Sequence, residues 1–162
     1  MIANPGSSEY TVGIAKALLS YGQAAQNYFG YNLGSPADAT GLLGAELAAV
    51  SIGEEYETVK EGNFREAGLA SAALVLESDT SIKLKLNREA AVRVDGREVA
   101  LTQSGDAWYA YITDISSTEL GNMFTIEIGD GTNSGTIRYS ALSWARNMIG
   151  SEKSDELARA IY

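Results

Sequence analysis

The feature that most constrains the fold is a strict alternation of apolar and polar residues over residues 81–86. The alternating residues are Ser81, Ile82, Lys83, Leu84, Lys85 and Leu86. Successive side chains of a β-strand point to opposite faces of a sheet. The pattern therefore predicts a strand with one buried face and one face in contact with solvent.

Other segments between about residue 56 and residue 139 have strand character and are separated by turn signals. The predicted strands are 56–60, 69–76, 81–86, 92–94, 98–102, 108–113, 124–128 and 136–139. Asp95-Gly96, Ser104-Gly105-Asp106 and the segment 129–135 are typical of turns. Short strands at roughly ten-residue spacing predict an antiparallel β-sandwich or a curled sheet.

Both ends of the chain have helical periodicity. Residues 8–30 carry an apolar stripe, predicted to be buried, at Ile14, Leu18, Tyr21, Ala25 and Tyr28. A second stripe, predicted to be solvated, contains Lys16, Ser20, Gln23 and Asn27. Residues 140–162 contain two further helices, separated at Gly150. We expect one α+β domain over residues 1–162, with the N-terminal helix and the two C-terminal helices packed on the sheet.

The composition excludes several classes of function. The chain of 162 residues has no cysteine and no histidine, which removes thiol nucleophiles, Ser-His-Asp triads and ordinary zinc sites. The formal net charge of -9 argues against nucleic acids and anionic membrane surfaces as partners. No apolar run approaches the roughly 18 residues of a membrane span. We therefore expect a protein that is not an enzyme, needs no cofactor and does not insert into membranes.

Acidic residues leave one enzymatic alternative, a pair of carboxylates as in glycosidases. Glutamates cluster at Glu54, Glu55, Glu57, Glu61 and Glu66, and we interpret this cluster as a solvated face. The segment 130–135 has a weak likeness to a calcium loop, but it lacks acidic residues at the third and fifth positions. We therefore predict a turn there, and a calcium site elsewhere stays open.

The most informative candidate site lies in the predicted strand 108–113. In a strand, Trp108, Ala110 and Ile112 share one face, which we expect to be the core side. Tyr109 and Tyr111 would then point outwards, about 7 Å apart, where their rings can stack on the apolar faces of sugars. We expect polar partners on the same face from Lys83, Lys85, Arg93, Glu127 and Arg138. The alternative is that a helix covers this face, or that the tyrosines are cross-strand packing pairs.

Three other aromatic residues are predicted to have structural roles. Tyr28 and Phe29 close the first helix and should anchor it on the sheet, while Trp144 should be a core residue. A short internal similarity relates residues 14–19 (Ile-Ala-Lys-Ala-Leu-Leu) to residues 157–162 (Leu-Ala-Arg-Ala-Ile-Tyr). It either arises by chance in an Ala-rich chain or indicates a tandem array, and we expect the chain to be excised from a larger multi-modular protein, with Met1 at the cut.

Four segments, residues 16–32, 108–115, 123–128 and 139–145, carry a resemblance to a known family. The sequence resembles a poorly annotated repeat module of large multi-domain surface proteins of anaerobic gut Clostridia, often found alongside dockerin, immunoglobulin-like or leucine-rich modules. The resemblance implies an extracellular or cell-surface location and a non-catalytic role, and the neighbouring modules of the same chain as partners. The Tyr111 position is often polar in that family, so the aromatic residue is a departure.

Two functions follow as hypotheses. The first is a glycan-binding or adhesion module, which recognises a polysaccharide or host glycan through Tyr109, Tyr111, Lys83, Lys85 and Arg138. The second is a structural spacer or protein-interaction module of a cell-surface or cellulosome-type protein.

Overall fold

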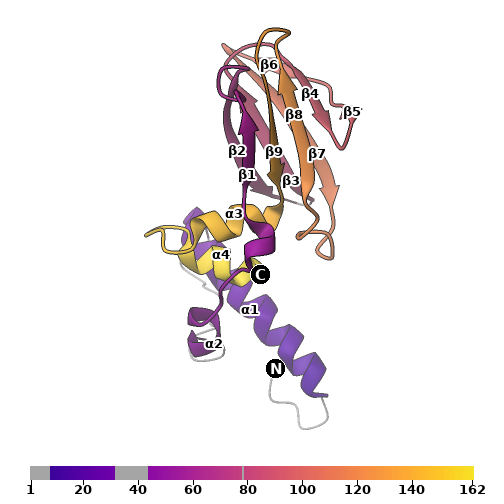
Figure 1. Ribbon diagram of the computed structural model, residues 1–162. Helices are drawn as coiled ribbons and strands as arrows, with labels where there is room; N and C mark the ends of the chain where they lie inside the picture. The colour runs from indigo at the N-terminus through magenta and orange to yellow at the C-terminus, as the bar shows by residue number, and fades with distance from the viewer. Residues whose placement is uncertain (1–7, 32–43, 78) are drawn as a thin grey trace. The chain divides into compact units, whose positions relative to one another are not determined.

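The computed structural model describes residues 8–31, 44–77 and 79–162 (Figure 1). The described chain divides into two compact units. The β-unit is Gly53–Trp144, and the helical unit combines Met1–Ile52 with Ala145–Tyr162. The α+β class and the antiparallel sheets expected from the sequence are confirmed. The expected packing of the helices on a sheet, within one domain, stays a prediction.

The β-unit contains two antiparallel sheets. The five-stranded sheet has the order β1-β9-β8-β4-β5, with β1 at Val59–Gly62, β9 at Ser134–Tyr139, β8 at Phe124–Gly129, β4 at Ala91–Val94 and β5 at Arg97–Glu98. The four-stranded sheet has the order β2-β3-β7-β6, with β2 at Leu69–Leu76, β3 at Thr80–Leu86, β7 at Ala107–Ile115 and β6 at Thr102–Ser104. A short 3-10 helix, Glu54–Tyr56, precedes β1.

The core of the β-unit is built from the inward faces of both sheets, as the alternation predicts. The fully buried large side chains include Ile82, Leu84, Leu86, Val92, Ile126 and Ile128. Burying an aliphatic side chain of this size contributes about 1.5–3 kcal/mol. Two sheets that each bury one apolar face pack as a sandwich, and Figure 1 shows them as two layers. Trp144 is only 8% exposed, so the prediction that it is a core residue is confirmed.

The region between β4 and β7 differs from the prediction. The turn at Asp95-Gly96 is confirmed, with both residues at positive φ (50° and 77°), the geometry that joins a tight hairpin. The strand predicted at 98–102 is wrong, because the chain leaves the five-stranded sheet after β5 and enters the four-stranded sheet at β6. The Val99 N–H donates to the Val92 carbonyl at 2.9 Å, so the crossing segment starts beside β4.

Helix α3, Ala141–Met148, begins at a reciprocal cap formed by two buried serines. The Ser143 N–H donates to the Ser140 hydroxyl, and the Ser140 N–H donates to the Ser143 hydroxyl, both at 3.0 Å. These bonds satisfy backbone donors that a helix start leaves unpaired. The helix is followed by Gly150 at φ 84°, which agrees with the predicted stop.

In the helical unit, helix α1 spans Glu9–Phe29 and has the predicted ends. The Ser8 hydroxyl accepts from the Thr11 N–H, and Gly30 closes the helix in the left-handed conformation. The predicted buried stripe is wrong, because Ile14 and Leu18 are 45% and 65% exposed. The buried residues of α1 are instead Ser20 and Ala24.

Helix α1 contacts helix α4, Asp155–Ile161, through the side that holds Asn27, whose amide donates to the Glu156 carboxylate at 3.2 Å. Small side chains let two helix backbones approach closely, and Ser20 and Ala24 supply them. The predicted anchoring role of Phe29 is also wrong, because its side chain is 56% exposed. Its ring contacts Tyr28 edge to face, with centroids 4.9 Å apart.

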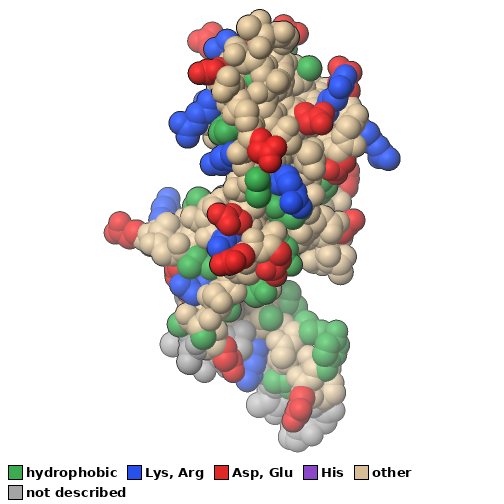
Figure 2. Space-filling model, viewed as in Figure 1, with side chains coloured by type: hydrophobic (Ala, Val, Ile, Leu, Met, Phe, Trp, Pro, Cys, Tyr) green, Lys and Arg blue, Asp and Glu red, His purple; other side chains and the backbone are tan. Residues whose placement is uncertain are grey.

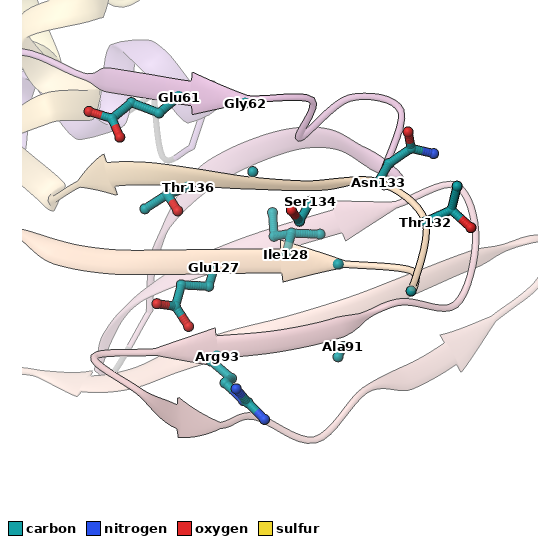
Figure 3. Close-up of a pocket in the computed structure, with 13 residues that line it drawn as sticks. Glu61, Gly62, Ala91, Arg93, Glu127, Ile128, Thr132, Asn133, Ser134 and Thr136 are labelled. Atoms are coloured by element: carbon teal, nitrogen blue, oxygen red, sulfur yellow. The ribbon is translucent and has the colours of Figure 1, made fainter.

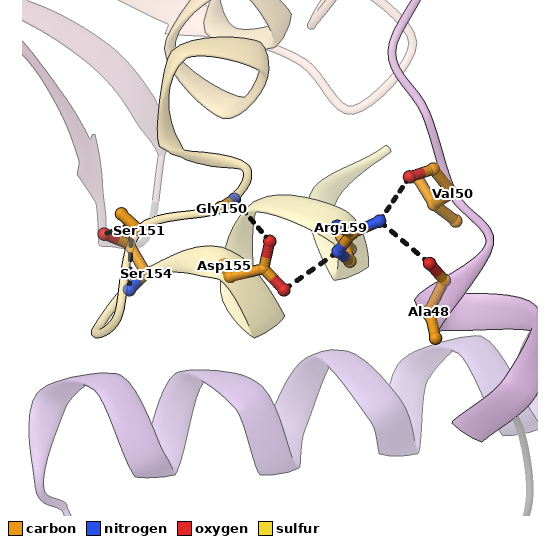
Figure 4. A network of polar contacts seen from close by, with 7 residues as sticks. All are labelled: Ala48, Val50, Gly150, Ser151, Ser154, Asp155 and Arg159. Carbon is orange, nitrogen blue, oxygen red and sulfur yellow. Dashed lines mark hydrogen bonds and ion pairs between the residues drawn. The ribbon is translucent and has the colours of Figure 1, made fainter.

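Arg159 connects α4 to the segment after helix α2, Gly44–Ala48 (Figure 4). Its guanidinium donates to the carbonyls of Ala48 and Val50 and to the Asp155 carboxylate. The Arg159 side chain and the Gly150 N–H both donate to Asp155 and lower the pKa of this carboxyl. Arg146 similarly donates to the Ile52 carbonyl. The helical unit thus relies on guanidinium bonds to backbone carbonyls.

Candidate functional site

Strand β7 orients its side chains as the sequence predicts. Ala110 and Ile112 are buried, and Trp108 on the same face is half-buried. Tyr109 and Tyr111 lie on the opposite, outer face of the four-stranded sheet. Tyr109 is half-buried, whereas Tyr111 is 39% exposed. Tyr111 therefore offers the more accessible ring.

Strand β3 places two lysines directly beside these tyrosines. Lys83 is the register partner of Tyr111, and Lys85 is the register partner of Tyr109. The Lys83 Nζ lies 4.4 Å from the centroid of the Tyr109 ring and 5.7 Å from that of Tyr111. An ammonium at this distance is attracted by the electron-rich ring faces. We refer to Lys83, Lys85, Tyr109 and Tyr111 as the aromatic–cationic face.

This arrangement bears on the alternative that Tyr109 and Tyr111 are cross-strand packing pairs. The tyrosines are cross-strand partners of lysines rather than of other aromatic residues. Lys83 occupies the space over the Tyr109 ring, so stacking of a ligand on Tyr109 competes with its ammonium. The aromatic–cationic face thus combines one accessible ring, Tyr111, with two ammonium groups.

The strands flanking the aromatic–cationic face carry small neutral residues. On β2, Ser71 and Ala73 are the register partners of Lys85 and Lys83, and both are exposed. On β6, Thr102 is the register partner of Tyr109. Across these two rows of paired residues the described strands carry no carboxylate. The rows are therefore locally cationic in a chain whose formal net charge is -9.

Arg138 does not belong to this face, and its predicted position is wrong. It lies in β9 of the five-stranded sheet, as do Glu127 in β8 and Arg93 in β4. The outward residues of this sheet form a second surface, which we call the mixed-charge face: Glu61, Arg93, Glu127, Thr136 and Arg138. The sequence could not separate the two sets, because alternation gives the face within a strand but not the sheet to which the strand belongs.

The mixed-charge face contains a shallow hollow of about 630 Å³ (Figure 3). Glu61, Arg93, Glu127 and Thr136 lie along its floor, and the backbone of the β8–β9 turn closes one end. Gly129 and Gly131 line this space without contributing a side chain. Gly135 lies in the inward row of the sheet, where a Cβ would lie 2.5 Å from the Phe64 backbone nitrogen, so this close approach requires glycine. From the sequence alone this glycine-rich segment indicates a turn, and nothing in its pattern indicates a hollow.

The glutamate cluster around β1 lies in contact with solvent. Glu54, Glu55, Glu57, Glu61 and Glu66 are all exposed, as predicted for a solvated cluster. The turn at 130–135 is also confirmed, because the Asp130 carboxylate accepts the N–H groups of Thr132 and Asn133. These bonds lower the pKa of Asp130. Within the described parts of the chain, no three acidic residues are grouped so that they could hold a metal ion.

Among the described residues, no helix has the length and apolar character needed to cross a membrane. Comparisons of the chain with models of protein families, with curated proteins and with solved structures find no match.

Proposed function

We propose that the chain is a non-catalytic extracellular or cell-surface module that binds polysaccharide through the aromatic–cationic face. The observation that carries this proposal is the pairing of the exposed Tyr111 ring with the Lys83 ammonium, 5.7 Å from its centroid. The apolar face of a pyranose ring packs on an aromatic plane, and an ammonium beside it donates hydrogen bonds to sugar oxygens.

The setting of these residues supports recognition with little ordering on binding. Tyr111 and Lys83 stand on adjacent, register-paired strands in the middle of the four-stranded sheet. Side chains on such a scaffold lose little conformational freedom when a ligand binds. The two lysines and the absence of a carboxylate in the two described rows favour glycans that carry carboxylate or sulfate groups.

A glycan array followed by calorimetric titration with the best ligand tests the proposal. Tyr111→Ala should weaken binding about tenfold, the factor that corresponds to roughly 1.4 kcal/mol of lost contact. Tyr10→Ala is the matched control, because Tyr10 is an exposed tyrosine of the helical unit. Arg138→Ala, on the mixed-charge face, should also leave the affinity unchanged. Failure of every neutral and acidic glycan to bind would contradict the proposal.

A second candidate, a spacer or protein-interaction module, is favoured by helix α1. Tyr10, Ile14 and Leu18 follow one another at four-residue spacing and are all exposed. Figure 2 shows hydrophobic side chains gathered over α1. Under this alternative Tyr111→Ala changes nothing, and a chain containing two copies in tandem has a higher thermal midpoint than one copy.

A further inference from the structure

The two sheets of the β-unit have four edge strands, and three of them are protected against pairing with another chain. Strand β5 has two residues and β6 has three. Strand β1 has four residues, which include Lys60 and Glu61. Short length and charged side chains are the features by which proteins protect sheet edges.

Strand β2 is the exception. It is an eight-residue edge strand, Leu69–Leu76, with the sequence Leu-Ala-Ser-Ala-Ala-Leu-Val-Leu. It contains no charged residue, proline or glycine, and among the described strands its single partner is β3. A long apolar edge without such protection is a template for the addition of another strand.

The free side of β2 begins after its first residues. The Leu69 N–H donates to the Phe64 carbonyl at 3.0 Å, and the register with β3 shifts between Leu69 and Ser71. From Ser71 to Leu76 the pairing with β3 is regular. Among the described residues, the backbone groups of residues 71–76 pair with β3. A regular strand paired on one side directs half of its N–H and C=O groups to the other side.

We propose that β2 pairs antiparallel with β2 of a second copy of this chain, centred on Ala73. In this register each Ala73 lies opposite the other, and Ser71 lies opposite Val75 of the second copy. The register keeps outer-face residues with outer-face residues, as a continuous sheet requires. No like charges meet along the strand, which makes it complementary to itself.

Such pairing joins two four-stranded sheets into one wider sheet, with a two-fold axis midway between the two Ala73 residues. An axis of this kind runs perpendicular to the sheet, so both aromatic–cationic faces would lie on the same side. A long glycan could then contact both copies. The pairing itself rests on β2 alone and does not depend on the proposed glycan binding.

Ala73→Glu tests the pairing, because it should weaken the dimer without destabilising the single chain. Within one copy, the new carboxylate would face Lys83, the register partner of Ala73, which is a favourable cross-strand pair. Between copies, the two new carboxylates would face each other. Sedimentation equilibrium over a concentration series should show a dimer for the unmodified chain and a dissociation constant raised about tenfold or more for A73E. A73Q, which has the same shape without the charge, should remain dimeric. Circular dichroism and a thermal melt verify that each variant is folded.

Cysteine cross-linking gives a second, independent measurement. The chain has no cysteine, so Ala73→Cys introduces a single thiol. A short bifunctional thiol reagent should convert A73C into a covalent dimer. Ser104→Cys, at the exposed β6 edge, should not be cross-linked, because β2 pairing leaves the two β6 strands at opposite edges of the joined sheet. A monomer at every concentration of the unmodified chain, or equal cross-linking of the two cysteine variants, would overturn the proposal.

Discussion

The outer faces of the two sheets are built in the same way but differ in chemistry. On the four-stranded sheet, lysines of β3 stand beside tyrosines of β7. On the five-stranded sheet, Glu127 of β8 stands between Arg93 of β4 and Thr136 of β9. The first face therefore has excess positive charge and an accessible ring, whereas charges on the second largely balance. The difference favours the first face for binding an acidic glycan and leaves the hollow of the second without an assigned ligand.

The first prediction tests whether the two sheets share one core, whatever their outer faces carry. Leu84→Ala in β3 and Ile126→Ala in β8 should each lower the free energy of unfolding by about 2–5 kcal/mol, because both side chains are fully buried. Chemical denaturation measures the effect. The outward controls Lys85→Ala and Arg138→Ala should stay within about 0.5 kcal/mol of the unmodified chain. A small loss at only one buried position would mean that one sheet contributes little to the core.

The second prediction concerns Tyr139, which follows the outward Arg138 in β9 and is buried. Burial raises the pKa of Tyr139 from 10 to about 12. The folded state therefore holds this proton more tightly than the unfolded state, so the stabilisation is complete below pH 10 and is lost as the pH rises towards about 12. The loss should reach about 2–3 kcal/mol. Denaturation at a series of pH values measures it, and Tyr139→Phe should remove this part of the pH dependence. An unchanged slope in Y139F would contradict the assignment.

The third prediction compares the cross-strand pairs directly and has the smallest expected effect. A double-mutant cycle on Lys83 and Tyr109 should give a coupling of about 0.5–1 kcal/mol, from the ammonium over the ring. The same cycle on Arg93 and Glu127 should give roughly 0.2–0.5 kcal/mol, because these opposite charges are exposed. The Arg93–Glu127 coupling should fall further in about 1 M salt. A larger coupling for Arg93–Glu127 than for Lys83–Tyr109 would contradict the contrast drawn between the two faces.

Much of the local structure could be predicted from the sequence. The alternation at 81–86, the apolar run at 69–76 and the Asp95-Gly96 turn all correspond to observed elements. The outward direction of Tyr109 and Tyr111 was also predicted, because it follows from alternation within a single strand. The prediction of a strand at 98–102 was wrong, since residues 99–101 contain no glycine or proline to signal that the chain changes sheets.

The errors arose where residues far apart in the sequence meet. Arg138 was expected beside the tyrosines, but strand pairing places it in the other sheet. The apolar stripe of α1 was expected to be buried, but the buried residues of this helix, which contacts α4, are Ser20 and Ala24. In both cases the local pattern was compatible with more than one partner, and the sequence pattern did not distinguish between them.

The sequence by itself determined the period of each segment, its turns and the absence of cysteine and histidine chemistry, because these depend on neighbouring residues or on composition. Only the tertiary structure decided that Lys83 lies over Tyr109 and Tyr111, that the charged residues form a separate face, and that β2 is an unprotected edge. These features depend on which strands pair, and that choice is made by burial of the whole apolar set in the core rather than by any one segment.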